Sequence, residues 1–203
     1  MLTLHVVGDS ISMHYGPFLE RYLSGLLAYS RKEGMPGDPQ EPNGANGGDS
    51  SLVLRYLTAC QQRVWHWNWM LLNCGLHDIK TDPLTGMKQI SPETYRRNLG
   101  AIVALARSLA EHIVWVRTTP VVDAIHNTRQ QQFHRFAADV DHYNAIADRI
   151  MAAQRIPTID LFGFTQTLGD DLYVDHVHFA EQVQQLQAAY IAGFLAASLQ
   201  VQR

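Results

Sequence analysis

Short apolar runs alternate with longer segments of helical periodicity along this chain. Leu2 to Val7 is apolar, partly β-branched and followed by a glycine, which predicts a strand and then a break. Three more apolar runs, Trp69 to Asn73, His112 to Thr118 and Pro157 to Leu161, predict further buried strands. A fifth strand is expected between Ser30 and Asn43, although no strand pattern is visible there.

Helical periodicity fills most of the sequence between these runs. Apolar residues recur at helical spacing from Gly16 to Tyr29 and from Ser50 to Cys60. A helix from Pro92 to Ala110 has Ser91 as a suitable N-cap and a proline at its first position. The stretch Arg31 to Asp49 carries five Gly and three Pro and predicts a loop. Two further helices are predicted over residues 133–153 and 180–199.

The alternation of strands and helices indicates βαβ units and a mostly parallel sheet covered on both faces. The chain of 203 residues is long enough to bury a hydrophobic core without disulfides. It shows no repeat, charge run or low-complexity segment that would mark a second domain. We therefore expect residues 1–203 to form a single domain of the α/β class.

The charge balance argues against a polyanionic partner. Sixteen Lys and Arg face nineteen Asp and Glu, and no Lys/Arg cluster stands out, so nucleic acid is not expected as a partner. The longest apolar stretches are shorter than the roughly 18–20 residues of a membrane span, and no signal peptide precedes the first strand. The chain as given is therefore expected to be soluble and cytoplasmic, with no membrane partner.

Neither the histidines nor the cysteines follow a metal-binding pattern. The ten His match no H-E-x-x-H or paired Cys/His spacing, so no metal is expected. Cys60 and Cys74 lie in apolar segments and do not form a C-x-x-C pair, so two buried thiols are the simplest interpretation. The loop after the first strand holds the acidic Asp9, which disfavours a phosphate and hence a flavin or nucleotide cofactor.

The first candidate catalytic motif is Gly8-Asp9-Ser10-Ile11-Ser12, directly after the first predicted strand. The glycine permits a sharp turn that presents Ser10 at the carboxyl end of a parallel strand. Open α/β sheets bind their ligands at this edge. Ser10 is therefore a candidate nucleophile, and the alternative for this motif alone is a serine that caps a helix.

A candidate acid–base motif, Asp175-His176-Val177-His178, lies near the C-terminus. The three-residue offset lets the carboxylate of Asp175 and the imidazole of His178 hydrogen-bond to each other within one folded-back loop. The carboxylate then fixes the tautomer, while the other ring nitrogen takes a proton from a serine. We predict His178 rather than His176 as the general base, although the spacing alone also arises by chance.

Two glycine-containing loops are candidates for stabilising an oxyanion. Asn73 to Asp78 (NCGLHD) follows the central apolar strand, and its His77 can donate a hydrogen bond at the same sheet edge as the first motif. Asp78 either supports His77 or caps a turn. Within Asn46 to Ser51 (NGGDSS), the N–H of Gly48 at the entry to a helix is a second candidate donor. The alternative for that segment is a flexible loop that caps a helix.

Taken together, these motifs resemble the SGNH/GDSL hydrolase family, whose first name stands for Ser, Gly, Asn and His in four sequence blocks. Ser10 matches the first block, Gly48 the second, and the GLHD sequence at residues 75–78 falls at the third. Asp175 and His178 match the fifth block, so the resemblance spans nearly the whole chain. The GDSISMHYGPF, GLHDIK and VHF stretches are similar to one bacterial subgroup that commonly has GLHD or GLWD in the third block.

The resemblance implies a three-layer α/β/α fold with a flavodoxin-like parallel sheet of about five strands. It also implies ester cleavage without a metal or organic cofactor, in which Ser10 attacks and His178 moves the proton. Asp175 would orient His178. The oxyanion would rest on the N–H groups of Ser10 and Gly48, with a side-chain donor from the third block.

The third block departs from the family pattern, which usually carries Asn as the side-chain oxyanion donor. This chain has His77 at that position, and an imidazole can donate one N–H. Asn46 or Asn73 is an alternative source of the missing amide. Loss of one such donor typically lowers the rate about 100- to 1,000-fold. An impaired enzyme is therefore conceivable, but an inactive one is not implied.

A small-molecule or carbohydrate ester is the expected substrate. The chain is compact and has no long apolar insertion for a lipid-binding lid, which favours short acyl groups and acetyl in particular. Trp65, Trp67 and Trp69 alternate on one face and either pack in the core or stack on a sugar. The residues expected to contribute to substrate binding are Asp9, His14, Tyr15, Asn46, Asp78 and Tyr173.

Two other functions remain open on the sequence alone. An acyltransferase would use the same residues with a sugar hydroxyl in place of water. A catalytically weak carbohydrate-binding protein on the same fold would explain the departure at His77, but such a module has no need of Ser10, Asp175 and His178 together. The polar connection around residues 126–132 is either a lid or a solvated loop, and the oligomeric state is not indicated.

Overall fold

Parallel strands form the centre of the structure, a computed structural model that describes residues 1–36 and 44–201. The strands in these residues are β1 (Leu2–Val7), β2 (Leu27–Arg31), β3 (Trp67–Leu72), β4 (Ala110–Val116) and β5 (Thr158–Ile159). They form one five-stranded sheet in the order β2-β1-β3-β4-β5, and every neighbouring pair is parallel. This flavodoxin-like order confirms the predicted α/β class.

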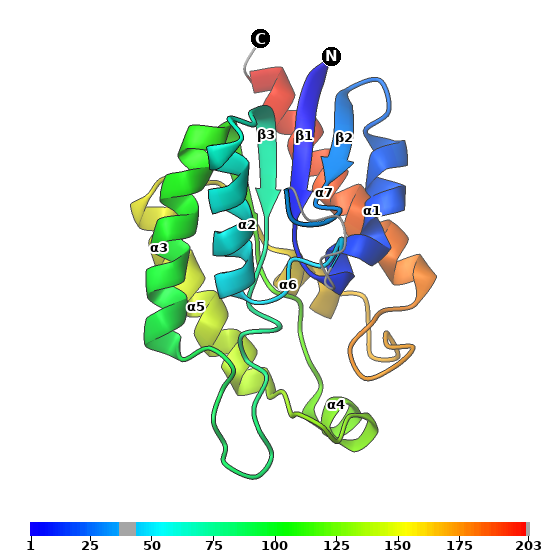
Figure 1. The fold of residues 1–203 in the computed structure, drawn as a ribbon. Coiled ribbons are helices and arrows are strands. Elements are labelled where there is room, and N and C mark those ends of the chain that lie inside the picture. The colour runs from blue at the N-terminus through cyan, green and yellow to red at the C-terminus, as the bar shows by residue number, and fades with distance from the viewer. Residues whose placement is uncertain (37–43, 202–203) are drawn as a thin grey trace.

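Helices cover both faces of the sheet. They are α1 (Ser10–Tyr22), α2 (Ser50–Gln62), α3 (Pro92–Leu109), α4 (Asp123–Arg129), α5 (Ala137–Ala153), α6 (Leu161–Gln166) and α7 (Glu181–Val201). α1 and α6 pack against α7 on one face, whereas α2, α3 and α5 pack together on the other (Figure 1). Of the helices in the described part, none has the length and apolar composition that crossing a bilayer requires.

The second strand lies earlier in the chain than predicted. The predicted helix from Gly16 to Tyr29 is wrong at both ends, because α1 begins at Ser10 and ends at Tyr22. A turn with Gly25 at φ +79° then leads into β2, whose Leu27 faces the core. Apolar residues of this short edge strand continue the helical spacing of α1, which hides the boundary. Of the predicted loop from 31 to 49, residues 37–43 lie outside the described part of the chain.

The other predicted elements are present with shifted ends. Ser91 is the N-cap of α3, and its side chain accepts a hydrogen bond from the Thr94 N–H at 3.3 Å, as predicted. β3 begins at Trp67 and β4 at Ala110, two residues earlier than expected in each case. The helices α4 and α6 were not predicted, because seven and six residues are too few for a periodic apolar pattern.

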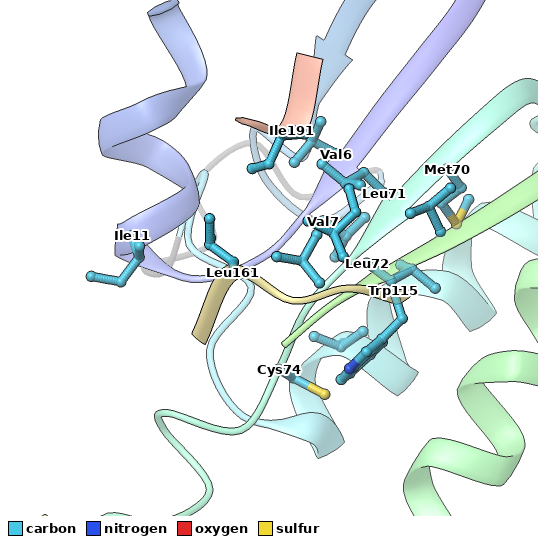
Figure 2. Close-up of a cluster of buried hydrophobic side chains, with 14 of the residues drawn as sticks. Val6, Val7, Ile11, Met70, Leu71, Leu72, Cys74, Trp115, Leu161 and Ile191 are labelled. Carbon is cyan, nitrogen blue, oxygen red and sulfur yellow. The ribbon is translucent and has the colours of Figure 1, made fainter. Parts of the chain in front are cut away.

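Strands β1, β3 and β4 become fully buried toward the carboxyl edge of the sheet. Residues of β1 and β3 such as Val7 and Leu72 are 0–1% exposed and pack near Trp115 of β4 (Figure 2). Burying each of these side chains contributes about 1.5–3 kcal/mol to the driving force for folding. Cys60 and Cys74 are free, buried thiols, as predicted. The loops that follow β1, β3 and β4 therefore start from fully buried strand ends.

Candidate active site

The loop after β1 presents Ser10 at the first turn of α1. Asp9 is the N-cap of this helix, and its carboxylate accepts a hydrogen bond from the Ile11 N–H at 3.0 Å. A Cβ at Gly8 would lie 2.9 Å from Ser12 Oγ, so glycine allows the sharp turn from strand to helix. Ser10 is partly exposed and follows β1, which lies beside β3 in the sheet. The strand order reverses between β1 and β3, which is where open α/β sheets bind ligands.

The loop before α7 brings Asp175 and His178 to Ser10. His178 Nε2 lies 2.8 Å from Ser10 Oγ, and His178 Nδ1 lies 2.6 Å from Asp175 Oδ2. The other carboxylate oxygen accepts hydrogen bonds from the N–H groups of Val177 and His178, both at 2.8 Å. One oxygen of Asp175 thus holds the folded-back loop and the other holds the imidazole. The structure brings together the three residues that the sequence predicts as catalytic.

Charge and hydrogen bonding at this triad favour proton transfer from Ser10. Burial acts to raise the pKa of Asp175, but the N–H groups of His178 and Val177 and the His178 ring outweigh it and hold that pKa below its usual value. The ionised carboxylate accepts the Nδ1–H of His178 and so fixes the tautomer. Nε2 is then the acceptor for the Ser10 hydroxyl, as a general base requires.

The second-block segment lies directly against the loop after β1. The Gly47 N–H donates to the Gly8 carbonyl at 2.8 Å, and a Cβ on Gly47 would lie 3.0 Å from that oxygen. Gly48 adopts φ +69°, a conformation that favours glycine. Its N–H, a predicted oxyanion donor, donates to Asn46 Oδ1 at 2.8 Å. Asn46 therefore presents its amide oxygen, not its NH₂ group, to this position.

His77 lies in the loop after β3, residues 73–78, hereafter the third-block loop. Burial, followed by the positive charges of Lys80 and Arg135, lowers the pKa of His77 to about 3. The ring is therefore neutral at ordinary pH and carries one N–H. Within the described residues the ring has no hydrogen-bond partner, and it is partly exposed. These properties suit a side chain that donates to a bound group.

Asp78 has a structural position, so the prediction that it contacts substrate is wrong. Its carboxylate is fully buried and accepts the N–H of Ser50, the first residue of α2, at 3.0 and 3.1 Å. Burial raises the pKa of Asp78 to about 7, and the charge of Asp49 raises it as well. The hydrogen bonds from Ser50 act in the opposite direction but are outweighed. The side chain ties the third-block loop to the start of α2.

Replacing Asp78 with Asn is expected to change how stability depends on pH. The folded state retains the Asp78 proton up to about pH 7, whereas the unfolded chain releases it near its ordinary pKa of 3.8. Ionisation therefore costs the wild type stability as the pH rises through this interval. Relative to wild type, the free energy of unfolding of Asp78→Asn should rise from pH 4 to pH 7, as measured in urea. A difference that stays constant with pH would contradict this.

Two further substrate-binding predictions are also wrong. Asp9 and Tyr15 are each 2% exposed, because Asp9 caps the N-terminus of α1 and Tyr15 lies on the buried face of that helix. Burial raises the pKa of Asp9, opposed by the Ile11 N–H and the charge of Arg135. Tyr173 is partly exposed, and its hydroxyl donates to the Pro120 carbonyl at 2.8 Å.

Histidine rings gather around His178. The partly exposed His14 ring lies 4.5 Å from it between centroids, and the His176 ring lies 5.9 Å from it. His126 in turn lies 5.0 Å from His176. Among residues 1–36 and 44–201, no group of three or more His, Cys, Asp or Glu side chains is arranged to hold a metal ion.

Asn73 is not placed to donate to an oxyanion, and the three tryptophans are not placed to contact a sugar at the triad. Asn73 Nδ2 donates to the Val116 carbonyl at 2.9 Å and so joins the ends of β3 and β4. Its amide is used in the fold, which removes it as the alternative oxyanion donor. Trp65 precedes β3, and Trp67 and Trp69 lie in its first half, so all three are at the opposite edge of the sheet from Ser10. They cannot stack on a sugar bound at the triad.

Residues of the connection between β4 and α5 also lie near the candidate site, although the sequence did not indicate them. Arg129 of α4 donates to the main-chain carbonyl of Asp175 at 2.8 Å, so α4 contacts residues 175–178, hereafter the acid–base loop. Arg135 is 3% exposed, and its Nε donates to the Leu76 carbonyl at 2.6 Å. His126 is fully buried, so this connection is not merely a solvated loop. The only sequence signal in this segment was its polar composition, and no motif indicated that these residues contact the site.

Comparison with protein families decides the class of the chain. A model of the GDSL-like lipase/acylhydrolase family matches residues 6–186. The chain belongs to this family. Membership makes it a carboxylic ester hydrolase, in agreement with the motifs in its first and fifth blocks. A comparison with curated proteins finds no match.

Solved structures with the same fold cover almost the whole GDSL-like chain. A lipase/acylhydrolase from Enterococcus faecalis is 16% identical with a TM-score of 0.68, covering 98% of this chain and 97% of that one. An acetylxylan esterase from Geobacillus stearothermophilus is 16% identical with a TM-score of 0.65, covering 94% and 92%. A carbohydrate acetylesterase from Sinorhizobium meliloti is 12% identical with a TM-score of 0.68, covering 97% and 99%. At these identities the similarity shows the fold alone.

Proposed function

We propose that this GDSL-like hydrolase is a serine esterase with Ser10 as nucleophile, His178 as general base and Asp175 as the residue that orients His178. The observation that carries the proposal is the continuous hydrogen-bonded chain from Ser10 Oγ through both ring nitrogens of His178 to Asp175 Oδ2. Such a chain lets one imidazole accept and then return a proton without moving.

The reaction follows from these positions in two halves. Ser10 Oγ attacks the ester carbonyl while its proton passes to His178 Nε2, and Asp175 stabilises the resulting imidazolium through Nδ1. His178 then protonates the departing alcohol, which leaves the acyl group on Ser10. In the second half, water gives its proton to Nε2 and attacks the acyl carbon, and the acid is released as Ser10 regains its proton.

The oxyanion of each tetrahedral intermediate would rest at the entries of two helices. Ser10 is the first residue of α1, and Gly48 lies just before α2, so their N–H groups are at the positive ends of two helix dipoles. When the oxyanion forms, the Gly48 N–H would donate to it instead of to the neutral amide oxygen of Asn46. The new hydrogen bond would be stronger, because its acceptor is charged. The neutral His77 ring would supply the side-chain donor.

Substitution of His77 tests the donor that departs from the family pattern. His77→Ala should lower kcat on 4-nitrophenyl acetate about 100- to 1,000-fold, because one oxyanion donor is lost. His77→Asn restores an N–H donor and should recover most of that rate. His66→Ala, an exposed histidine before β3, is the matched control and should retain full activity. Equal rates for His77→Ala and wild type would exclude His77 from the oxyanion site.

Short acyl esters, acetyl in particular, on a carbohydrate are the proposed substrates. The fold shared with an acetylxylan esterase and a carbohydrate acetylesterase supports this choice. His14 and Tyr173, both partly exposed and close to the acid–base loop, are the proposed contacts for the sugar together with Asn46.

An acyl-chain series tests the proposed function. The kcat/KM for 4-nitrophenyl acetate should exceed that for the octanoate at least tenfold, and acetylated xylo-oligosaccharides should release acetate. Preference for the octanoate would instead indicate a lipase. Acetylated glycerol appearing when glycerol is added, in place of free acetate, would favour acyl transfer over hydrolysis.

A further inference from the structure

A short antiparallel bridge gathers two cations and one aromatic ring beside the third-block loop. The Thr81 N–H donates to the His134 carbonyl at 2.9 Å, and the His134 N–H donates back at 2.8 Å. Residues next to such a pair point to the opposite side from it. Lys80 Nζ and Arg135 Cζ accordingly lie 4.8 and 4.9 Å from the centroid of the same ring, that of Phe133.

Neither cation has a carboxylate partner in the described part of the chain. The ion pairs there are made by Lys88, Arg117 and the acid–base loop, and none includes Lys80 or Arg135. Nearby carboxylates are already engaged, since both Asp9 and Asp49 accept helix N-terminal N–H groups. Arg135 is 3% exposed, and although the charge of Asp9 raises its pKa, burial outweighs that effect. A ligand that brings a further negative charge would offset the remaining cost of burial.

Donors remain available on both cations. Arg135 uses Nε for the Leu76 carbonyl and Nη1 for His126 Nε2, so within the described residues Nη2 has no partner. The half-buried Lys80 ammonium offers three more donors. Burial and the charge of Arg135 lower the pKa of Lys80, and burial lowers the pKa of Arg135 to about 10. An anion bound between them would offset both the burial and the mutual repulsion.

We propose that Lys80, Arg135 and Phe133 form an anion-binding subsite for a carboxylate or phosphate group of the ester substrate. The subsite flanks the proposed catalytic residues, because Arg135 holds the Leu76 carbonyl next to His77. On its other side the His126 ring links Arg135 to His176, the neighbour of the acid–base pair. The inference rests on the proposed esterase function and narrows its substrates to negatively charged esters, such as acetylated uronic acids or sugar phosphates.

Three monoacetylated substrates of matched size test the subsite: methyl glucoside, methyl glucuronoside and methyl glucoside 6-phosphate. With wild-type protein, kcat/KM for acetate release from at least one charged substrate should exceed that for the neutral one about 10- to 100-fold. The preferred substrate identifies carboxylate or phosphate as the group recognised. Lys80→Gln should bring the charged-to-neutral ratio close to one. Equal rates on all three substrates would overturn the subsite and leave the esterase proposal intact.

Control variants and a binding assay separate the subsite from the esterase chemistry. Arg63→Gln removes the same charge at the far end of α2 and should keep the wild-type ratio. If Arg63→Gln and Lys80→Gln behave alike, Lys80 is not part of a subsite. Inorganic phosphate and unacetylated methyl glucuronoside should raise the melting temperature of the wild type, but not of Lys80→Gln, against sodium chloride of equal ionic strength. This readout holds even if no ester is cleaved, and no shift from either anion would overturn the proposal.

Discussion

Replacing Ser10 with Ala is expected to lower kcat on 4-nitrophenyl acetate by about 10⁴-fold or more. The substitution removes the hydroxyl that lies 2.8 Å from His178 Nε2, so neither an acyl-enzyme nor its proton transfer can form. The oxyanion donors remain, and the residual rate over the reaction in water would come from them. Stopped-flow or steady-state release of 4-nitrophenol measures the loss.

The same variant should fold normally, which separates lost chemistry from lost structure. Ser10 is partly exposed, and in the described residues its hydroxyl forms a hydrogen bond with His178 alone, so the melting temperature should change little. Ser24→Ala, at an exposed serine after α1, is the matched control and should retain full activity. Activity that persists in Ser10→Ala would remove Ser10 as the nucleophile.

The sequence indicated which candidate catalytic residues would meet better than it indicated the boundaries of the helices and strands. Strand ends are marked by a change from apolar to polar residues, and in a parallel sheet these ends share one edge. Gly8-Asp9-Ser10 and the third-block loop could therefore be placed together before any contact was known. Asp175 and His178 were added because a serine nucleophile needs an oriented imidazole as its base. Each of these three motifs is weak evidence alone, but together they resemble one family. The match to the GDSL-like family model agrees with that interpretation.

Elements stabilised by tertiary contacts rather than by local pattern were missed. β2 is a five-residue edge strand in which only Leu27 is fully buried, so it lacks the apolar run that identifies β1. α4 has seven residues and no side-chain N-cap hydrogen bond. Its place is set by contacts distant in sequence, such as the bond from Arg129 to the Asp175 carbonyl. No periodicity within seven residues can encode that contact.

Several polar residues were predicted to contact substrate only because they are close in sequence to a catalytic motif. Closeness in sequence does not fix the direction of a side chain. Asp78 follows His77 directly, yet the first is fully buried under α2 while the second is partly exposed. Tyr15 follows His14 in the same way, and helix geometry turns it inward by about 100°. Arg135 is 59 residues away from Leu76, the residue whose carbonyl it holds. An isolated arginine in a polar segment gives no sign of such a contact.

Replacing Asp175 with Asn is expected to lower kcat by about 10⁴-fold while leaving the acid–base loop in place. The Asn oxygen can still accept the N–H groups of Val177 and His178, which hold the loop. Its NH₂ group would instead face His178 Nδ1, so the ring proton would shift to Nε2 and the base would point a donor at Ser10. Asp171→Asn, at an exposed carboxylate nearby, is the matched control. A loss below tenfold would show that the Asp175 carboxylate does not set the tautomer, and His178 would then act without it.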